Sequence, residues 1–294
     1  MKQLIKEAVK SFSRNLVALT ERSKMGRYLL DQIVNSAMGQ IVEVRHQGIN
    51  LTFSCPNSLN RWRATTFSTK EPESLEWIDS FEEGAVFWDI GANVGLYSLY
   101  AARRKKCHVY AFEPSVFNLE LLARNVWLNE LTDFITLIPL PLTERQSVRK
   151  LNMSSMDWGG ALSTFGEEFG HDGKPLSKIF EFRTLGISMQ DAVGALGIPR
   201  PDYIKMDVDG IEHLILKGGP SVMGRVKQVL IEINEDFPEQ AEQSALHLMQ
   251  AGLALKEKRH AEMVASSAFK SVFNQIWQRP LEQAACVNSP EAEN

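Results

Sequence analysis

The chain has few cysteines, no long apolar run and no excess of basic charge. Its three cysteines, Cys55, Cys107 and Cys286, are far apart and form no C-x-x-C pair. The sequence therefore predicts neither a zinc site nor a disulfide framework, and it favours a reducing, cytoplasmic setting. A formal net charge of −4 gives no general reason to expect nucleic-acid binding, which calls for a basic face. No stretch approaches the roughly 20 apolar residues of a membrane span.

The N-terminal 40 residues have a helical pattern and a basic surplus. Lys6, Lys10 and Arg14 interrupt each apolar run before it reaches the length of a signal-peptide core. Residues 1–30 carry seven basic and two acidic side chains. Two interpretations stay open: a helix on an anionic membrane surface, or a capping or homodimer helix with a solvated basic face, which we favour. The apolar residues recur every three or four positions, at Leu4, Ile5, Val9, Phe12, Leu16 and Leu19.

The remainder of the chain alternates short apolar runs with helix-like segments. Period-two alternation around Gly48 predicts a hairpin of strands 41–44 and 49–53. The later alternation predicts βαβ units and a doubly wound, mostly parallel α/β sheet. We expect an N-terminal helical and hairpin extension over 1–70, a main domain over 71–280 and a disordered tail over 281–294. The predicted strands are 85–89, 108–112, 135–140, 202–206 and 228–233, and the clearest predicted helices are 116–129 and 189–196.

The most informative stretch is VFWDIGANVGLYSLYAARR, residues 86–104. An apolar run, a glycine-bearing turn and a helical pattern follow one another, an arrangement typical of nucleotide-like ligand sites. A dinucleotide fingerprint counted from Gly91 would need glycines where Asn93 and Leu96 stand. Without those glycines or a P-loop lysine, the pattern favours an adenosine derivative lacking phosphates, with S-adenosylmethionine as the candidate. The predicted cofactor contacts in this turn are Asp89, Gly91, Ala92, Asn93 and Gly95.

A second motif, HVYAFEPSVFNLELLARN, spans residues 108–125. Its predicted strand ends at Glu113, about two dozen residues after Asp89, close to the offset at which a carboxylate receives the ribose hydroxyls. Pro114 suits the start of the next helix. Glu113 and Pro114 complete the predicted cofactor set.

An acidic strand end follows in PDYIKMDVDGIEHLILKGG, residues 201–219. The carboxyl ends of parallel strands face the ligand crevice. We therefore predict Asp207, Asp209 and His213 as catalytic residues that act on the substrate that receives the transferred group, and not on the cofactor. His213 titrates near neutral pH and is one candidate general base, although it has an equal prospect of facing only the helix surface. Glu232 and Glu235 are further candidates for the same cleft. A glycine-rich segment, residues 154–175, reads as a substrate-facing insertion or as a plain surface loop.

Five ordered segments of the chain resemble the FkbM family of class I S-adenosylmethionine-dependent methyltransferases, which have a Rossmann-like fold. The resemblance implies O-methylation of a hydroxyl, commonly on a sugar or a glycolipid headgroup. Two features depart from the family pattern: Asp209 stands where the family has glutamate in D-x-E-G, and residues 154–175 exceed the shorter members. The segments are FWDIGANVGLYSLYAA, VYAFEPSVFNLELLARN, FRTLGISMQDAV, PDYIKMDVDGIEHLILKG and VLIEINEDF.

Two other functions compete with this one. Asp207-Val208-Asp209 also spells the D-x-D pattern with which glycosyltransferases hold a divalent metal against a nucleotide sugar. A non-catalytic partner subunit would keep the fold and serve as a scaffold. The glycine turn and Glu113 together favour the methyltransferase. The acceptor, the oligomeric state and the use of a metal are not determined by the sequence.

Overall fold

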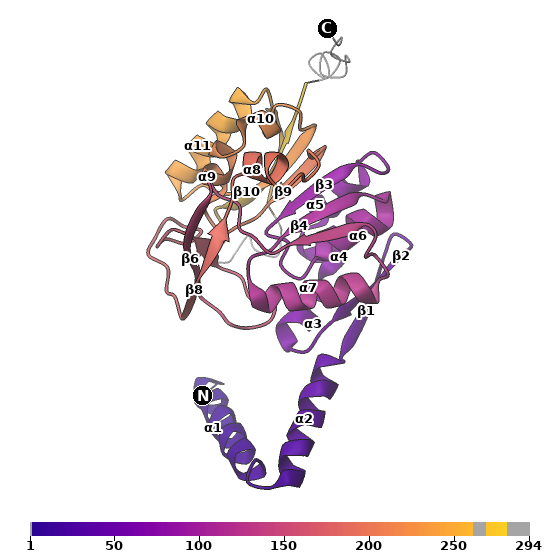
Figure 1. Cartoon of the computed structure of the whole chain (residues 1–294), viewed down its shortest axis with the longest axis vertical. Coiled ribbons are helices and arrows are strands. Elements are labelled where there is room, and N and C mark those ends of the chain that lie inside the picture. Colours follow the sequence, from indigo (N-terminus) through magenta and orange to yellow (C-terminus); the bar gives the residue numbers. More distant parts are fainter. Residues whose placement is uncertain (1, 261–268, 281–294) are drawn as a thin grey trace.

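The computed structural model describes residues 2–260 and 269–280 (Figure 1). The predicted tail over 281–294 lies outside the described residues. Among the residues described, no helix is both long and apolar enough to cross a membrane.

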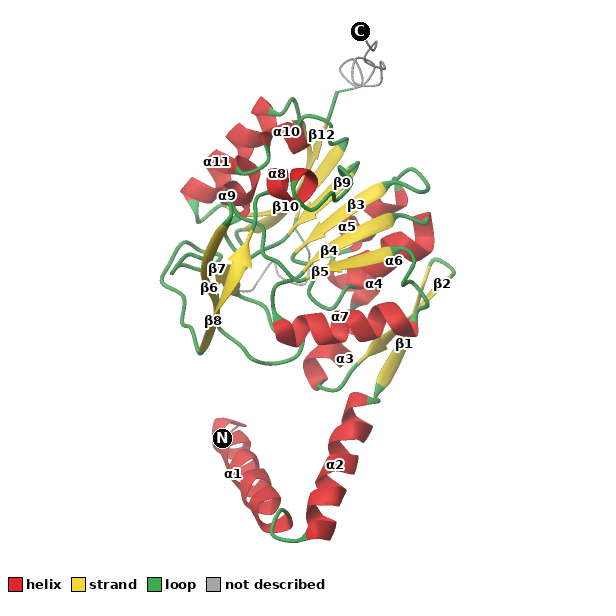
Figure 2. Cartoon of the chain, viewed as in Figure 1, coloured by secondary structure: helices red, strands yellow, loops and turns green. Residues whose placement is uncertain are grey.

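A seven-stranded sheet forms the centre of the molecule (Figure 2). All five predicted strands are present, and the pairs β10–β9, β9–β3, β3–β4 and β4–β5 are parallel. The two remaining pairs, β10–β12 and β12–β11, are antiparallel, so β12 runs opposite to the strands on either side of it. The predicted doubly wound, mostly parallel sheet is therefore confirmed. In spatial order the strands are β11 (Ala254–Arg259), β12 (Val272–Gln278), β10 (Gln228–Asn234), β9 (Tyr203–Met206), β3 (Val86–Ile90), β4 (His108–Phe112) and β5 (Ile135–Ile138).

Helices cover both faces of this sheet, because consecutive strand residues point to opposite sides. Phe87 packs into one buried apolar cluster and Trp88 into the other, and neither is exposed. Strands buried on both faces appear as continuous apolar runs, which is why the sequence revealed them. The Phe87 side holds α5 (Pro72–Asp79), α6 (Leu96–Lys105) and α7 (Val116–Leu128); the Trp88 side holds α8 (Met189–Gly194), α9 (Glu212–Lys217), α10 (Pro220–Met223) and α11 (Pro238–Gln250).

The N-terminal helical prediction corresponds to two helices, and the predicted hairpin is confirmed. The helices project from the main body as a V (Figure 1), and Ser23 caps the second by accepting from the Gly26 amide at 2.9 Å. Leu51 and Phe53 of the hairpin belong to the apolar cluster under α6 and α7, so the hairpin shares the core of the main body. These elements are α1 (Lys2–Thr20), α2 (Lys24–Met38), β1 (Ile41–His46), β2 (Ile49–Ser54), α3 (Ser58–Thr65) and α4 (Phe67–Lys70).

The part of the chain between β5 and α8 forms a small antiparallel sheet beside the main one. It consists of β6 (Ser147–Met153), β7 (Ser163–Phe165) and β8 (Phe180–Gly186), in the order β7-β6-β8. The sequence suggested that segment 154–175 is a loop throughout. The structure differs, because β7 lies inside this segment. Three residues are too few to show strand alternation, so only the pairing with β6 reveals this strand.

The strand order reverses between β3 and β9. From β3 the chain continues through β4 to β5 on one side, and it later returns to β9 and β10 on the other. Ligands of such sheets bind outside the carboxyl ends of the strands at this reversal. The turns after Ile90 and Met206 are therefore where a site is expected.

Candidate functional site

Two adjoining cavities open at this edge of the sheet. The smaller, of about 60 Å³, lies over the ends of β3 and β4 and includes Glu113 and Pro114. The larger, of about 350 Å³, lies over the ends of β9 and β10 and extends to α3 and α4. Both are lined by Gly91, Asn93, Ala161, Asp207 and Asp209.

The turn after β3 forms the wall between the cavities. The amides of Gly91 and Ala92 both donate to the Phe112 carbonyl, at 2.9 and 3.1 Å. Gly91 has φ +85°, and a Cβ there would lie 2.0 Å from the carbonyl oxygen of Asp207. Asn93 has a left-handed conformation, with φ +51°. The turn thus needs glycine at position 91 for its conformation and for its closeness to the turn after β9.

Glu113 lies in the smaller cavity, as its motif predicted. Its two carboxylate oxygens accept from the amides of Asn93, at 2.7 Å, and Ser115, at 2.8 Å. Burial raises the pKa of Glu113 to about 7, against the effect of these amides. A carboxylate has about four acceptor positions, so capacity remains for the two hydroxyls of a ribose.

Asp89, in contrast, lines neither cavity. It is 1% exposed and accepts from the Ser98 hydroxyl at 2.5 Å. Burial raises its pKa, partly offset by the charge of Lys205. Asp89 therefore holds α6 in position beneath the glycine turn. The sequence predicted a direct contact between Asp89 and a cofactor, whereas the structure gives Asp89 a positioning role. Gly95, also predicted as a contact, begins α6 at φ +86° and likewise lies outside both cavity linings.

The segment 158–163, from the predicted insertion, covers the site. The Gly160 carbonyl accepts from the side-chain amides of Asn93, at 2.9 Å, and Asn118, at 3.0 Å. The Gly159 carbonyl accepts twice from Arg63, at 3.0 and 2.7 Å. These contacts fasten the segment to the glycine turn, to α7 and to α3, so the prediction that the insertion faces the site is consistent with its position.

Asp209 holds the far end of this segment. Its Oδ2 accepts from the amides of Leu162, at 2.7 Å, and Ser163, at 3.1 Å. Burial and the neighbouring Asp207 raise the pKa of Asp209 to about 6. Because Asp209 is occupied with the backbone, the structure favours a role in positioning over direct proton transfer.

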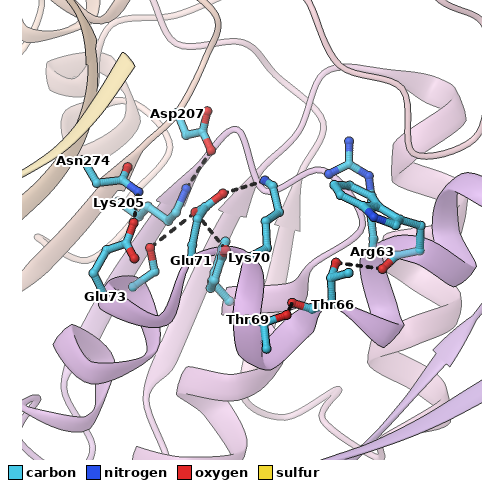
Figure 3. Close-up of polar contacts among 12 residues, drawn as sticks. Arg63, Thr66, Thr69, Lys70, Glu71, Glu73, Lys205, Asp207 and Asn274 are labelled. Carbon is cyan, nitrogen blue, oxygen red and sulfur yellow. Dashed lines mark hydrogen bonds and ion pairs between the residues drawn. The ribbon is translucent and has the colours of Figure 1, made fainter. Parts of the chain in front are cut away.

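Asp207 faces both cavities and pairs with a buried lysine (Figure 3). Lys205 Nζ lies 2.8 Å from Asp207 Oδ2 and 4.8 Å from the centre of the Tyr97 ring. Burial disfavours the charged form of Lys205, but Asp207, Glu71 and Asp89 keep its pKa above the usual value. The pair places a fixed positive charge next to the shared wall.

A second ion pair lines the larger cavity from the helices before β3. Lys70 Nζ lies 2.5 Å from Glu71, whose other oxygen accepts from the Tyr97 hydroxyl at 2.8 Å. Figure 3 shows the two ion pairs side by side. Although burial opposes ionisation of Glu71, Lys70 and Lys205 hold its pKa below the usual value. Arg63, Lys70 and Glu71 belong to no recognisable motif, so their place in this cavity was not predicted from the sequence.

Glu232 also lines the larger cavity. It is one position beyond Ile231, which pairs with Met206 of β9, so Glu232 and Asp207 stand at the same level of the sheet. Burial, together with Asp207, Glu71 and Asp209, raises its pKa well above the usual value. Glu235 instead forms an ion pair with Lys258 outside both cavities.

The position of His213 differs from the prediction that this side chain faces the ligand crevice. It is buried between α9 and α11, with its ring edge-on to Phe237 at 6.0 Å, and it lines neither cavity. Burial lowers its pKa. The reason is the short α9, whose packing against α11 turns this face of the helix away from the strand ends. His213 therefore belongs to the core between two helices.

The acidic residues form no evident metal centre. In the described parts of the chain, no group of three or more His, Cys, Asp or Glu side chains is arranged to hold a metal ion. Asp207 pairs with Lys205, and Asp209 accepts two amides. The geometry thus gives the D-x-D interpretation no support.

Comparison with known proteins gives two curated relatives. The chain is 27% identical over 175 residues to the hexuronic acid methyltransferase AglP of Haloferax volcanii, covering 59% of this chain and 66% of that protein. It is 28% identical over 170 residues to methyltransferase sdnD of Sordaria araneosa, covering 44% of this chain and 58% of that protein. The chain thus spans two thirds or less of the length of these relatives.

Solved structures give only a distant likeness. A putative transferase from Pyrococcus horikoshii has a TM-score of 0.45 at 13% identity, covering 81% of this chain and 70% of that one. TYW2 of M. jannaschii, solved in complex with AdoMet, has a TM-score of 0.42 at 13% identity, covering 82% and 87%. Such scores carry no inference about function.

The family comparison is decisive, because a family model matches more than half of the chain. The match to the methyltransferase FkbM domain runs over residues 89–263. It includes the glycine turn, Glu113, the Asp207 turn and Glu232. The protein therefore belongs to the FkbM-domain family of methyltransferases.

Proposed function

We propose that this protein transfers a methyl group from S-adenosylmethionine to a hydroxyl group of a sugar. The observation that carries this proposal is the pair of cavities with a common wall at Gly91 and Asp207. A donor in one cavity and an acceptor in the other would meet at that wall. Methyl transfer needs such in-line contact between the two reacting groups.

The smaller cavity suits the adenosine half of the donor in its chemistry. Glu113 offers acceptor positions to a ribose, and the tight turn at Gly91 allows close approach of backbone to ligand. When bound, the donor supplies a methyl group on a positively charged sulfur. At about 60 Å³, the cavity is smaller than the roughly 300 Å³ at which ligand pockets begin. Binding therefore requires segment 158–163 to move away from Asn93 and Asn118.

The larger cavity suits a polyhydroxylated acceptor. Trp62, Tyr97 and Phe269 contribute rings to its lining, and carboxylates at Asp207 and Glu232 can accept from hydroxyl groups. The relative that acts on a hexuronic acid supports a sugar acceptor. The carboxylate of a uronic acid would interact favourably with the positive charges of Arg63 and Lys70. A neutral sugar has no group that would pair with these charges.

The acceptor hydroxyl must lose a proton as its oxygen bonds to the methyl carbon. Glu232 is the side chain we assign to receive it, because it lines the acceptor cavity and its raised pKa makes its carboxylate a stronger base. Asp207, held in place by its ion pair with Lys205, is assigned to hold the hydroxyl in line. Once the carbon–sulfur bond breaks, the sulfur is left as an uncharged thioether and the proton resides on Glu232.

The test uses the purified full chain with S-adenosylmethionine carrying a labelled methyl group. Neutral sugars, uronic acids and their glycosides are offered as acceptors, and label in the sugar is measured. The proposal expects label in at least one sugar, with the wild type active and Glu232→Gln at least about 100-fold slower. Donor binding without transfer to any hydroxylated compound would instead identify a scaffold. Sugar transfer from a nucleotide sugar with Mn²⁺ would identify a glycosyltransferase.

A further inference from the structure

The N-terminal helix α1 presents an apolar face that the rest of the described chain leaves uncovered. Six large apolar side chains on α1 are between 52% and 76% exposed. At 100° per residue they lie on one side of the helix, within an arc of about 140°. These side chains are Leu4, Ile5, Val9, Phe12, Leu16 and Leu19.

The opposite side of α1 is basic. Lys6, Lys10 and Arg14 follow one another at intervals of four residues, and all are exposed. Glu7 is the one acidic side chain in α1, and it pairs with Lys10 at 3.1 Å. Apolar and basic residues therefore occupy separate faces, the arrangement typical of helices that lie in a membrane interface.

The second helix also carries exposed apolar side chains. Tyr28, Leu29 and Ile33 of α2 are 60%, 52% and 54% exposed. α1 and α2 meet at the turn that joins them, where Gly26 lies against Thr20, and the V that they form stands clear of the main body (Figure 2). A flat partner can therefore reach α1.

We propose that α1 lies in the surface of a membrane that contains anionic lipids, with its apolar face among the acyl chains and Lys6, Lys10 and Arg14 toward the headgroups. Charge complementarity selects this partner, because negatively charged lipids pair with the basic face. A second copy of the chain would cover the apolar face but would leave the basic face without an anionic partner. Spanning the bilayer is excluded for the described helices, since the basic residues recur along the middle of α1.

The experiment is co-sedimentation of the full chain with vesicles of phosphatidylcholine and phosphatidylglycerol at 70:30, at low and high salt. We expect binding to these vesicles, loss of binding in 0.5 M salt, and little binding to pure phosphatidylcholine. The triple change Lys6→Glu, Lys10→Glu and Arg14→Glu should weaken binding by at least about 100-fold, since each basic residue near the surface contributes about fivefold. A control triple, Arg183→Glu, Arg225→Glu and Lys256→Glu, alters the net charge equally at exposed positions elsewhere and should bind as the wild type does.

The apolar face is tested separately with Phe12→Glu and Leu16→Glu together. These changes should also abolish binding, whereas Trp127→Glu, which replaces a side chain 71% exposed on α7, should not. Wild-type protein that ignores anionic vesicles would overturn the proposal. So would a dimer, detected by sedimentation velocity, that Phe12→Glu dissociates in the absence of any vesicle binding. Both readouts are independent of methyl transfer.

Discussion

Gly91 and Asp207 lie so close together that a side-chain carbon on Gly91 would stand 2.0 Å from the Asp207 carbonyl. The two residues follow neighbouring parallel strands, β3 and β9, and the Asp207 amide donates to the Ile90 carbonyl at 3.0 Å. The two cavities share this contact. Any change that separates the two turns should therefore impair binding on both sides.

Replacing Gly91 by alanine tests this relationship. The added carbon collides with backbone and the residue must keep φ +85°, so Gly91→Ala should cost more than about 2 kcal/mol of unfolding free energy or abolish donor binding. Gly194→Ala is the matched control, because a Cβ there meets nothing within 4 Å and should be neutral or slightly stabilising. Thermal unfolding and calorimetry measure both effects. Equal behaviour of the two variants would refute the packing argument.

Changing Asp207 and Glu232 tests the acceptor side. Asp207→Asn and Glu232→Gln should each lower turnover by roughly 10²–10⁴-fold while the dissociation constant of the donor changes little. His213→Gln should leave turnover close to the wild-type value, because His213 lies between α9 and α11. Parallel loss of donor binding and turnover in the Asp207 variant would move that residue to the donor side.

Segment 158–163 should move when the donor binds. Trp158 Nε1 donates to Glu120 at 3.1 Å, and the segment lies over a cavity too small for adenosine. S-adenosylhomocysteine should therefore change the tryptophan fluorescence, and Trp158→Phe should remove that change while donor affinity is retained. Fluorescence that stays constant at saturating ligand would contradict the movement.

The buried Glu212 should make the protein less stable as pH rises. Burial raises its pKa to about 7, so the folded state keeps a proton that the unfolded state releases above its usual pKa of 4.5. Stability attributable to this proton is present below pH 4.5 and is lost as pH rises to about 7. The loss is at most about 3 kcal/mol. Chemical unfolding of wild type and Glu212→Gln between pH 5 and 8 should show a shallower decline in the variant, and identical slopes would contradict the assignment.

The sequence predicted the central sheet well because β3, β4, β9 and β10 are buried on both faces and appear as apolar runs. It also predicted that Glu113 stands directly after β4, since one strand, one turn and their spacing define that position. These features depend on residues that are near one another in the chain. Which face of a helix points toward the site depends on residues that are distant in the chain, and for that reason His213 was misplaced.

The larger cavity was less predictable because it is assembled from distant segments. Arg63, Lys70 and Glu71 come from helices about 20 to 30 residues before the glycine turn, and they reach the cavity only through packing of α3, α4 and α5. The Asn57 side chain, which accepts from the Asn60 amide at 2.8 Å, and Pro72 at the start of α5 could have signalled the helices. Both signals mark where a helix begins, but neither indicates which part of the protein the helix packs against.

The most direct test of the central claim is calorimetric titration with S-adenosylhomocysteine and, separately, with NAD. We predict binding of S-adenosylhomocysteine, and an affinity about 10- to 100-fold weaker in Glu113→Gln, because the amide cannot accept as strongly from the ribose hydroxyls. The affinity should also increase as pH rises through about 7, where Glu113 becomes charged. Tighter binding of NAD, or an unchanged affinity in a folded Glu113→Gln variant, would contradict the account.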